Sequence, residues 1–525
     1  MNFSMRDIHG ELDRLAQLPD QARMRVLTGV QEQIARLRQL HAPTEVSTED
    51  YYEVLCRAAG MMSDAIPPGS RDDVLVDAEE SFREVMAADV SESLKAWAAY
   101  SLGTTVSEQI DVAERRRWAS KDGYDPEEQP LRWSLRERLR ETRLLLAGTG
   151  HSPYVEPILR SKALCNLGNA LDTSGRWLEA YEAYQDSLTE YPNNGNAAGN
   201  IAELLASRIR LRRGQPGHYA ALFNRYARLA KRLREHTIGI SSEAAADGWD
   251  ALREIDGVGH ESHDGDSGDF YQRWVAQNRL ALSVAMEGLG SEGPRWDDAD
   301  VEAALIPTDS PTPLAIFAAV NVLKSEYLVA RRLAYDGIVE LADGATDESG
   351  TYAETNDNSV FGQPAAKIVL AQRATLDVLD KIAVVANLYF EVGDPADRVK
   401  FRTFWTNRKT SELRPELPQF KPWPNYRFAL AELAYDVDEN GLYADAQLLR
   451  NAGTHRLVHV KRDGYTGPTR DAIVSVGEKD LASASLQALR VARAAYLYLL
   501  DFIAEDYLAF GDEDQPTTLI ETRLS

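Results

Sequence analysis

Residues 161–192 read SKALCNLGNALDTSGRWLEAYEAYQDSLTEYP, and this stretch decides how the first half of the chain folds. Its first part repeats leucine at helical spacing until Gly175 marks a turn. Its second part places large apolar residues three or four apart until Pro192 stops the helix. The small residues Gly168 and Ala180 allow two antiparallel helices to approach closely. The stretch therefore predicts a helical hairpin.

This hairpin resembles a tetratricopeptide repeat in its Leu-Gly pair, its Ala, its aromatic residue and its closing Pro. It departs from the repeat at Leu164, where Trp is usual, and at Ser187, where Ala is usual. One repeat cannot bury its own apolar face, so we expect neighbouring helices, the next of them over 194–212. The following aromatic residues are interpreted as core packing rather than a ligand cage: Trp177, Tyr181 and Tyr184.

Length and composition indicate a multidomain globular protein. The chain has 525 residues, of which 44% are hydrophobic and 27% charged, so we expect two to four domains. Cys56 and Cys165 lie far apart without a CxxC context, which predicts neither a disulfide framework nor a cysteine metal site. The polar start, residues 1–14, has no apolar targeting segment, and no stretch has the roughly 20 apolar residues of a membrane span. We therefore expect a cytoplasmic protein without a membrane partner.

The net charge of −24 argues against a protein that coats nucleic acid in general, because phosphate binding needs clustered Lys and Arg. Residues 401–470 are an exception, with 11 Lys and Arg against 8 Asp and Glu. A local excess of three positive charges favours an RNA site in this part of the chain.

The predicted fold class is all-α: an N-terminal helical repeat array followed by a C-terminal bundle of four to five helices. In the second half, periodicity predicts helices over about 365–392, 425–437, 442–460 and 478–510, and no strand. The expected divisions are a helical region with repeats over 1–230, a helical connecting region over 231–340 with an acidic loop at 256–269, a linker over 341–365, the bundle over 366–510 and a tail over 511–525.

The string Leu448-Leu449-Arg450-Asn451-Ala452-Gly453-Thr454-His455-Arg456 carries an Arg-x4-His pattern in the second half of this bundle. With the Leu379-Asp380-Lys381-Ile382-Ala383 helix and the Leu-, Ala- and Tyr-rich last helix, it resembles the HEPN superfamily, the higher eukaryote and prokaryote nucleotide-binding domains. The resemblance is to the LA2681-like HEPN group, whose members carry tetratricopeptide-type helices upstream. It is strongest over about 366–510 and extends back toward 270.

The resemblance implies a metal-independent endoribonuclease that needs no cofactor and leaves 2′,3′-cyclic phosphate and 5′-hydroxyl ends. His455 would act as general acid or base, and its reference pKa of about 6.5 suits that work. Arg450 would bind the phosphate and its developing charge through a planar guanidinium, and Asn451 would orient His455 or the phosphate. A role in bacterial defence or stress, as a toxin or antiviral effector, would follow, with the repeats binding a protein partner or restraining the nuclease.

Helix geometry adds a constraint on this site. Five residues along a straight α-helix leave Arg450 and His455 about 140° apart, whereas Asn451 and His455 share a face. HEPN nucleases resolve this by dimerising, so we expect a homodimer through the bundle. Leu457 stands where some HEPN toxins carry a Tyr, so a switch by modification of that Tyr has no support here.

Several further side chains are weaker candidates. His459 lies one helical turn beyond His455 on the predicted helix and is a candidate assisting residue. A set of cations is a candidate RNA path, with a plain solvated face as the alternative: Arg456, Lys461, Arg462, Arg490 and Arg493. The acidic loop with His260 and His263 matches no known metal motif and is interpreted as solvated, so no metal site is predicted.

Other classes of function are disfavoured or kept as an alternative. The chain has no GxSxG, no Walker A motif and no GxGxxG after a strand, so it does not read as a serine hydrolase, a P-loop enzyme or a Rossmann enzyme. The alternative to the nuclease is a non-catalytic helical adaptor, in which the repeats bind protein and the HEPN fold serves for dimerisation or for nucleotide or RNA binding.

Overall fold

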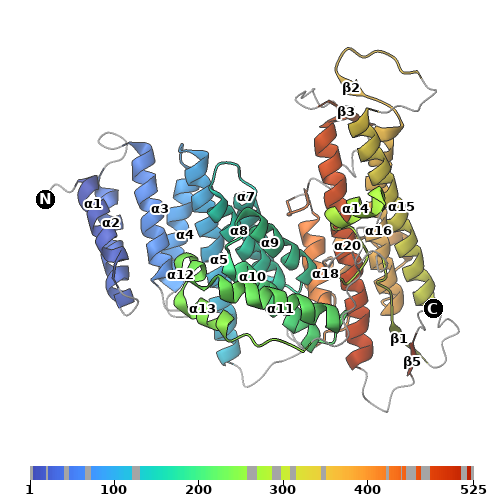
Figure 1. Cartoon of the computed structure of the whole chain (residues 1–525), viewed down its shortest axis with the longest axis horizontal. Helices are drawn as coiled ribbons and strands as arrows, with labels where there is room; N and C mark the ends of the chain where they lie inside the picture. The colour runs from blue at the N-terminus through green and yellow to red at the C-terminus, as the bar shows by residue number, and fades with distance from the viewer. Residues whose placement is uncertain are drawn as a thin grey trace. The chain divides into compact units, whose positions relative to one another are not determined.

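The computed structural model describes fourteen segments of the chain, which are residues 4–18, 22–40, 47–65, 72–120, 131–256, 269–285, 297–307, 315–344, 351–420, 425–438, 440–444, 457–462, 473–509 and 517–521. These residues are mostly helical, as predicted (Figure 1). Contacts divide the chain into two compact units. The first comprises 1–172, 179–201 and 226–252, and the second comprises 173–178, 202–225 and 253–525. No helix among the described residues is both long and apolar enough to cross a bilayer.

The first unit is a helical array whose long helices up to residue 172 each pack against the next one along the chain. Its helices in chain order, three of them shared with the second unit, are α1 (Met5–Ala16), α2 (Arg23–Gln39), α3 (Thr48–Asp64), α4 (Asp72–Ala87), α5 (Glu92–Ser120), α6 (Leu131–Ser134), α7 (Arg136–Gly150), α8 (Pro157–Asp172), α9 (Trp177–Glu190), α10 (Gly195–Arg210), α11 (Pro216–Arg232), α12 (Arg234–Ile240) and α13 (Glu243–Asp250). This nearest-neighbour packing is consistent with the predicted repeat array.

The predicted hairpin is α8 and α9, and its packing explains its small residues. A Cβ at position 168 would overlap the Tyr184 ring, so only glycine allows α8 and α9 to come this close. Tyr184 is 2% exposed, and Trp177 and Tyr181 are also buried, which confirms that these aromatic residues are core. The next helix expected over 194–212 is α10, with Asn194 as its N-cap residue.

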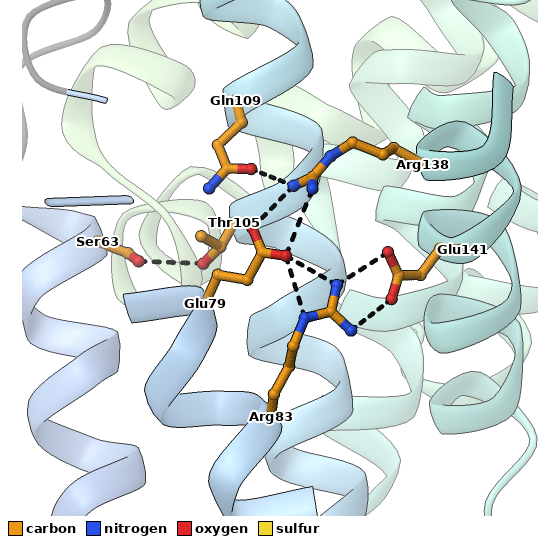
Figure 2. A network of polar contacts seen from close by, with 7 residues as sticks. All are labelled: Ser63, Glu79, Arg83, Thr105, Gln109, Arg138 and Glu141. Atoms are coloured by element: carbon orange, nitrogen blue, oxygen red, sulfur yellow. Dashed lines mark hydrogen bonds and ion pairs between the residues drawn. The ribbon is translucent and has the colours of Figure 1, made fainter. Parts of the chain in front are cut away.

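A network of charged side chains links α4, α5 and α7 (Figure 2). The Glu79 carboxylate accepts hydrogen bonds from Arg83, at 2.7 Å, and from Arg138, at 2.8 Å. Arg83 also forms a bidentate pair with Glu141, at 2.7 and 3.0 Å. Glu79 thus links α4 to α7, and Arg138 also donates to Gln109 of α5, so the network joins three helices of the array.

The second unit is built around a helical bundle closed at each end by a small sheet (Figure 1). The long helices α15 (Ala315–Asp343), α16 (Gln363–Tyr389) and α20 (Glu478–Ala509) pack side by side, and α18 (Tyr426–Asp436) packs against α20. The remaining elements are α14 (Phe270–Gln277), η3 (Ala396–Arg398), α17 (Phe401–Phe404), β1 (Ala303–Pro307), β2 (Ser359–Val360), β3 (Leu457–Lys461), β4 (Ile473–Gly477) and β5 (Thr517–Glu521).

The sheets correct the expectation that this half contains no strand. β2 pairs antiparallel with β3, and β3 pairs in parallel with β4. Val460 of β3 packs with Ile368 of α16 and Leu481 of α20, so this sheet covers one end of the bundle. At the other end β1 pairs antiparallel with β5, which lies in the expected tail. These short strands are stabilised by partners distant in sequence, so local periodicity does not reveal them.

Two expected boundaries also change. The helix predicted over 442–460 cannot extend to its end, because Leu457–Lys461 is a strand. The segment 341–365, predicted as a linker between domains, connects α15 to α16, which pack along each other within one unit. The predicted helices over 365–392, 425–437 and 478–510 correspond to α16, α18 and α20.

Candidate active site

The motif residues Arg450, Asn451, His455 and Arg456 lie outside the described residues, as does the loop with His260 and His263. The structure describes the chain on both sides of the motif, up to residue 444 and again from residue 457. The candidate site is therefore built from the segments that enter and leave it.

The segment that enters the motif is held by a buried ion pair. α18 ends at Asp436, and the backbone N–H of Tyr443 donates to the Asp436 carbonyl at 2.9 Å. A Cβ at Gly441 would overlap that same carbonyl, so this turn requires glycine. Arg176 donates to the Asp436 carboxylate, and neither side chain has any exposed surface. Its guanidinium also lies 5.8 Å from the centre of the Tyr443 ring. Arg176 thus holds both ends of the turn that precedes the motif.

The segment that leaves the motif is β3, with His459 at its centre. Ser359 of β2 donates its hydroxyl proton to Asp357, and its Oγ lies 2.5 Å from Nε2 of His459. Because that hydroxyl proton points to the carboxylate, Nε2 must carry a proton and donate to Ser359. In a catalytic triad the imidazole lies between serine and carboxylate, whereas here serine lies between the other two. The cluster therefore does not activate Ser359 as a nucleophile.

The Asp357 carboxylate, beside this histidine, accepts several hydrogen bonds. The carboxylate accepts a hydrogen bond from the Lys461 ammonium group at 2.5 Å and lies 3.9 Å from Nε2 of His459. Hydrogen bonds from Lys461, Ser359 and Thr355 hold the pKa of Asp357 well below its usual range, so it is ionised at neutral pH. Phe361 stacks on the His459 ring, with 5.6 Å between the centres. The result is a histidine held in one orientation by residues of the 351–362 segment.

His459 cannot be placed one helical turn beyond His455, as the sequence suggested, because it stands on a strand. Its side chain is 21% exposed, so the ring is partly accessible. Nδ1 has no hydrogen-bond partner among the residues the structure describes, and it is the ring atom left for proton transfer. His459 is therefore a candidate assisting residue through Nδ1 only.

The other predicted RNA contacts that the structure describes lie in different environments. Lys461 is buried and paired with Asp357, whereas Arg462 is exposed. Arg490 donates to the Asn278 carbonyl at 3.1 Å, and Arg493, which is buried, donates to the Ala281 carbonyl at 2.7 Å. The two arginines of α20 thus hold the 278–281 segment against the bundle.

Sequence reasoning missed Asp357, Ser359 and Arg176. The first two lie in the stretch expected to be a linker, and Arg176 lies in the turn of the repeat hairpin. Ser359 and His459 are 100 residues apart, and Arg176 and Asp436 are 260 apart. No local pattern indicates such pairs.

The first unit contains a second candidate site, an amide-lined groove of about 300 Å³ on α5, α8 and α10. The side-chain amide of Asn200 donates to Oδ1 of Asn169 at 2.7 Å, and Oδ1 of Asn196 accepts from the indole N–H of Trp249 at 3.0 Å. Lys162 also lines the groove, and partial burial lowers the pKa of its ammonium group, which the charge of Asp64 partly offsets. Amides and one cation lining a concave surface can bind the backbone of an extended peptide.

A four-helix bundle with an Arg-x4-His sequence between its third and fourth described helices is the arrangement expected of a HEPN domain. The model of the LA2681-like HEPN family matches residues 307–506, so this part of the chain is an LA2681-like HEPN domain. The match covers α15 as well as the bundle predicted over 366–510, up to residue 506. No curated protein and no solved structure matches the chain.

Proposed function

We propose that this protein is a HEPN endoribonuclease that cleaves RNA without a metal ion and leaves 2′,3′-cyclic phosphate and 5′-hydroxyl ends. The observation that carries the proposal is the family match over 307–506, which spans the Arg-x4-His sequence. HEPN domains are commonly ribonucleases, and the pattern supplies one imidazole and one guanidinium for a phosphodiester.

In the proposed reaction, the ribose 2′-hydroxyl gives its proton to a general base as its oxygen attacks the adjacent phosphorus. The bond from phosphorus to the 5′-oxygen breaks, and that oxygen takes up a proton. His455 serves as the base or the acid, and Arg450 stabilises the charge on the phosphate oxygens. Asn451 orients the imidazole or the phosphate. His459 assists through Nδ1.

The test compares the wild-type chain with Arg450→Ala/His455→Ala in a bacterial host. A matched control replaces an exposed arginine and an exposed histidine elsewhere, Arg253→Ala/His236→Ala. We expect growth arrest and new 5′-hydroxyl RNA ends with the wild type and the control, and neither with the motif variant. Cleavage by the purified protein should persist in EDTA. Intact RNA with the wild-type chain would refute the nuclease.

We further propose that the active form is a homodimer that brings two motifs to one cleft. The support is the separation of about 140° between Arg450 and His455 on a straight helix. Mixing the single variants Arg450→Ala and His455→Ala should then restore part of the activity, because one of two composite sites regains both groups. A monomer by light scattering at micromolar concentration, or no recovery on mixing, argues against shared sites.

The amide-lined groove supports a protein partner for the first unit. We propose that it binds an extended peptide segment and thereby restrains or recruits the nuclease in bacterial defence or stress. The same groove favours the adaptor as the second candidate function. Asn166→Ala/Asn200→Ala should abolish co-purification of the partner while leaving cleavage by the isolated protein unchanged. If RNA stays intact with both the wild-type chain and the motif variant while the groove variant loses its partner, the adaptor is the better description.

A further inference from the structure

A basic cavity lies in the second unit between the end of α16 and the turn that follows α17. Its volume is about 430 Å³. Five cations and two carboxylates line it, in an acidic chain, and the cations are Arg398, Lys400, Arg408, Lys409 and Arg414. None of these residues belongs to the Arg-x4-His motif or to the cations predicted as an RNA path.

Three of these cations are available to a ligand. Arg414 is engaged with Asp394 at 2.6 Å, and Lys400 lies 3.6 Å from Asp380. Arg398, Arg408 and Lys409 are exposed, and none has an ion-pair partner among the residues that the structure describes. Within the described part of the chain, the Arg408 guanidinium donates one hydrogen bond, to the Arg398 backbone carbonyl at 3.4 Å.

The turn that carries these cations is held by its backbone. Asn407 donates its N–H to the Glu412 carbonyl at 2.8 Å, and Ser411 donates to the Asn407 carbonyl at 2.8 Å. The backbone N–H of Arg414 donates a hydrogen bond to the backbone carbonyl of Trp405, and the Trp405 side chain is buried. A held turn presents Arg408 and Lys409 at defined positions, which lowers the entropy lost when they bind a ligand.

The cavity lies beside the chain that leads into the motif. Arg402 of α17 pairs with Asp438 at 3.2 Å, and the N–H of Gly441 donates to the Asp438 carbonyl at 2.9 Å. Residues 440–444 continue from this point toward Arg450. The cavity therefore lies close to the described segment that precedes the motif in the sequence.

We propose that this cavity is an RNA-binding site, in which Arg398, Arg408 and Lys409 contact backbone phosphates and position the strand for cleavage. The proposal rests on the proposed nuclease function and deepens it. Guanidinium groups bind phosphate oxygens in bidentate fashion, and the hydroxyls of Thr403 and Thr406, which also line the cavity, can donate to them. The remaining acidic chain repels RNA at a distance, which restricts productive binding to this surface.

The test measures RNA binding separately from cleavage. The full chain carries Arg450→Ala/His455→Ala, and anisotropy of a labelled single-stranded RNA of about 20 nucleotides is followed from about 50 to 200 mM salt. Adding Arg398→Gln/Arg408→Gln/Lys409→Gln should weaken binding at least about tenfold at low salt. The slope of log K against log salt should fall by about 2, because each phosphate contact on a single strand contributes about 0.7.

The matched control removes three exposed cations elsewhere, Arg6→Gln/Arg38→Gln/Arg253→Gln, and so changes the net charge equally. Binding that is weakened as much by this control as by the cavity variant overturns the proposal. The variant Arg398→Lys/Arg408→Lys should keep most of the affinity and salt slope.

Competitors identify the ligand class. Unlabelled RNA should displace the probe at far lower concentration than inorganic phosphate or a polyglutamate peptide of equal charge. Displacement by the peptide as effective as that by RNA would mean a general anion or protein surface and would overturn the RNA assignment. If the wild-type chain cuts no RNA and the cavity variant binds RNA more weakly than the protein that keeps these cations, the nuclease proposal fails and the RNA-binding site stands.

Discussion

Replacing Arg176 with Met should destabilise the second unit strongly, because it leaves a buried carboxylate without its counter-charge. The Arg176 and Asp436 side chains both have no exposed surface. Glu432, one turn earlier on α18, is also fully buried, so the change leaves two buried carboxylates on one helical face. Removing one partner of a buried ion pair costs about 3–5 kcal/mol. For a domain of about 150–250 residues, that corresponds to a fall in Tm of roughly 6–20 °C, and the larger second unit should lie in the lower part of this range.

The assay is thermal and urea unfolding of the full chain, followed by far-UV circular dichroism. We expect the transition of the second unit to move and that of the first unit to stay. The double variant Arg176→Met/Asp436→Leu should recover most of the loss, since a well-packed apolar pair can replace a buried ion pair. A loss under about 1 kcal/mol for Arg176→Met, or a double variant no better than the single one, would show that the pair does not hold the turn before the motif. On the proposed nuclease function, Arg176→Met should also slow RNA cleavage, since that turn precedes Arg450 in the sequence.

Three further changes test other parts of the structure. Burial raises the pKa of Glu505 to about 8, so the fold favours the protonated carboxyl. The contribution of this group to stability is therefore lost as pH rises from the ordinary value of 4.5 through about 8. Glu505→Gln should flatten this pH dependence and leave the variant more stable than wild type at pH 9 in urea titrations. Gly168→Ala should cost about 1–3 kcal/mol, because its Cβ overlaps the buried ring of Tyr184, and an unchanged Tm would contradict that packing. Desolvation of Glu79 is outweighed by hydrogen bonds from Arg138 and Arg83, which lower the pKa of its carboxyl. Its contribution to folding stability is therefore present above the ordinary pKa of 4.5 and is lost as pH falls below it. Glu79→Gln should cost about 1 kcal/mol at pH 7 and less at pH 3, and an equal cost at both pH values would exclude an ionic role.

Local periodicity predicted the long elements of this protein closely. α16, α18 and α20 begin and end within a few residues of their predicted limits, because each buries an apolar face along its own length. The hairpin of α8 and α9 could be predicted for the same reason, since Gly168 and Tyr184 lie close together in the sequence. The Arg-x4-His sequence also needs no tertiary information to be recognised, and with the helices around it the pattern pointed to the family whose model matches 307–506.

The strands β2, β3 and β4 were not predictable in this way. They are two to five residues long, and β3 pairs with β2 about 100 residues earlier in the chain. The basic cavity was anticipated only as a charge excess over 401–470. Which of the cavity's cations remain exposed and without an ion pair among the described residues depends on carboxylates such as Asp394 and Asp380, which pair with Arg414 and Lys400.

The sequence by itself determined a helical protein with a helical hairpin, a bundle and an Arg-x4-His sequence, since these depend on residues within a few turns of one another. Only the tertiary structure decided that His459 stands on a strand beside Ser359 and Asp357, and that Arg176 holds the turn before the motif. The physical reason is that an ion pair or hydrogen bond depends on distance in space. Folding brings together groups that are 100 to 260 residues apart, and no local pattern records which of them will meet.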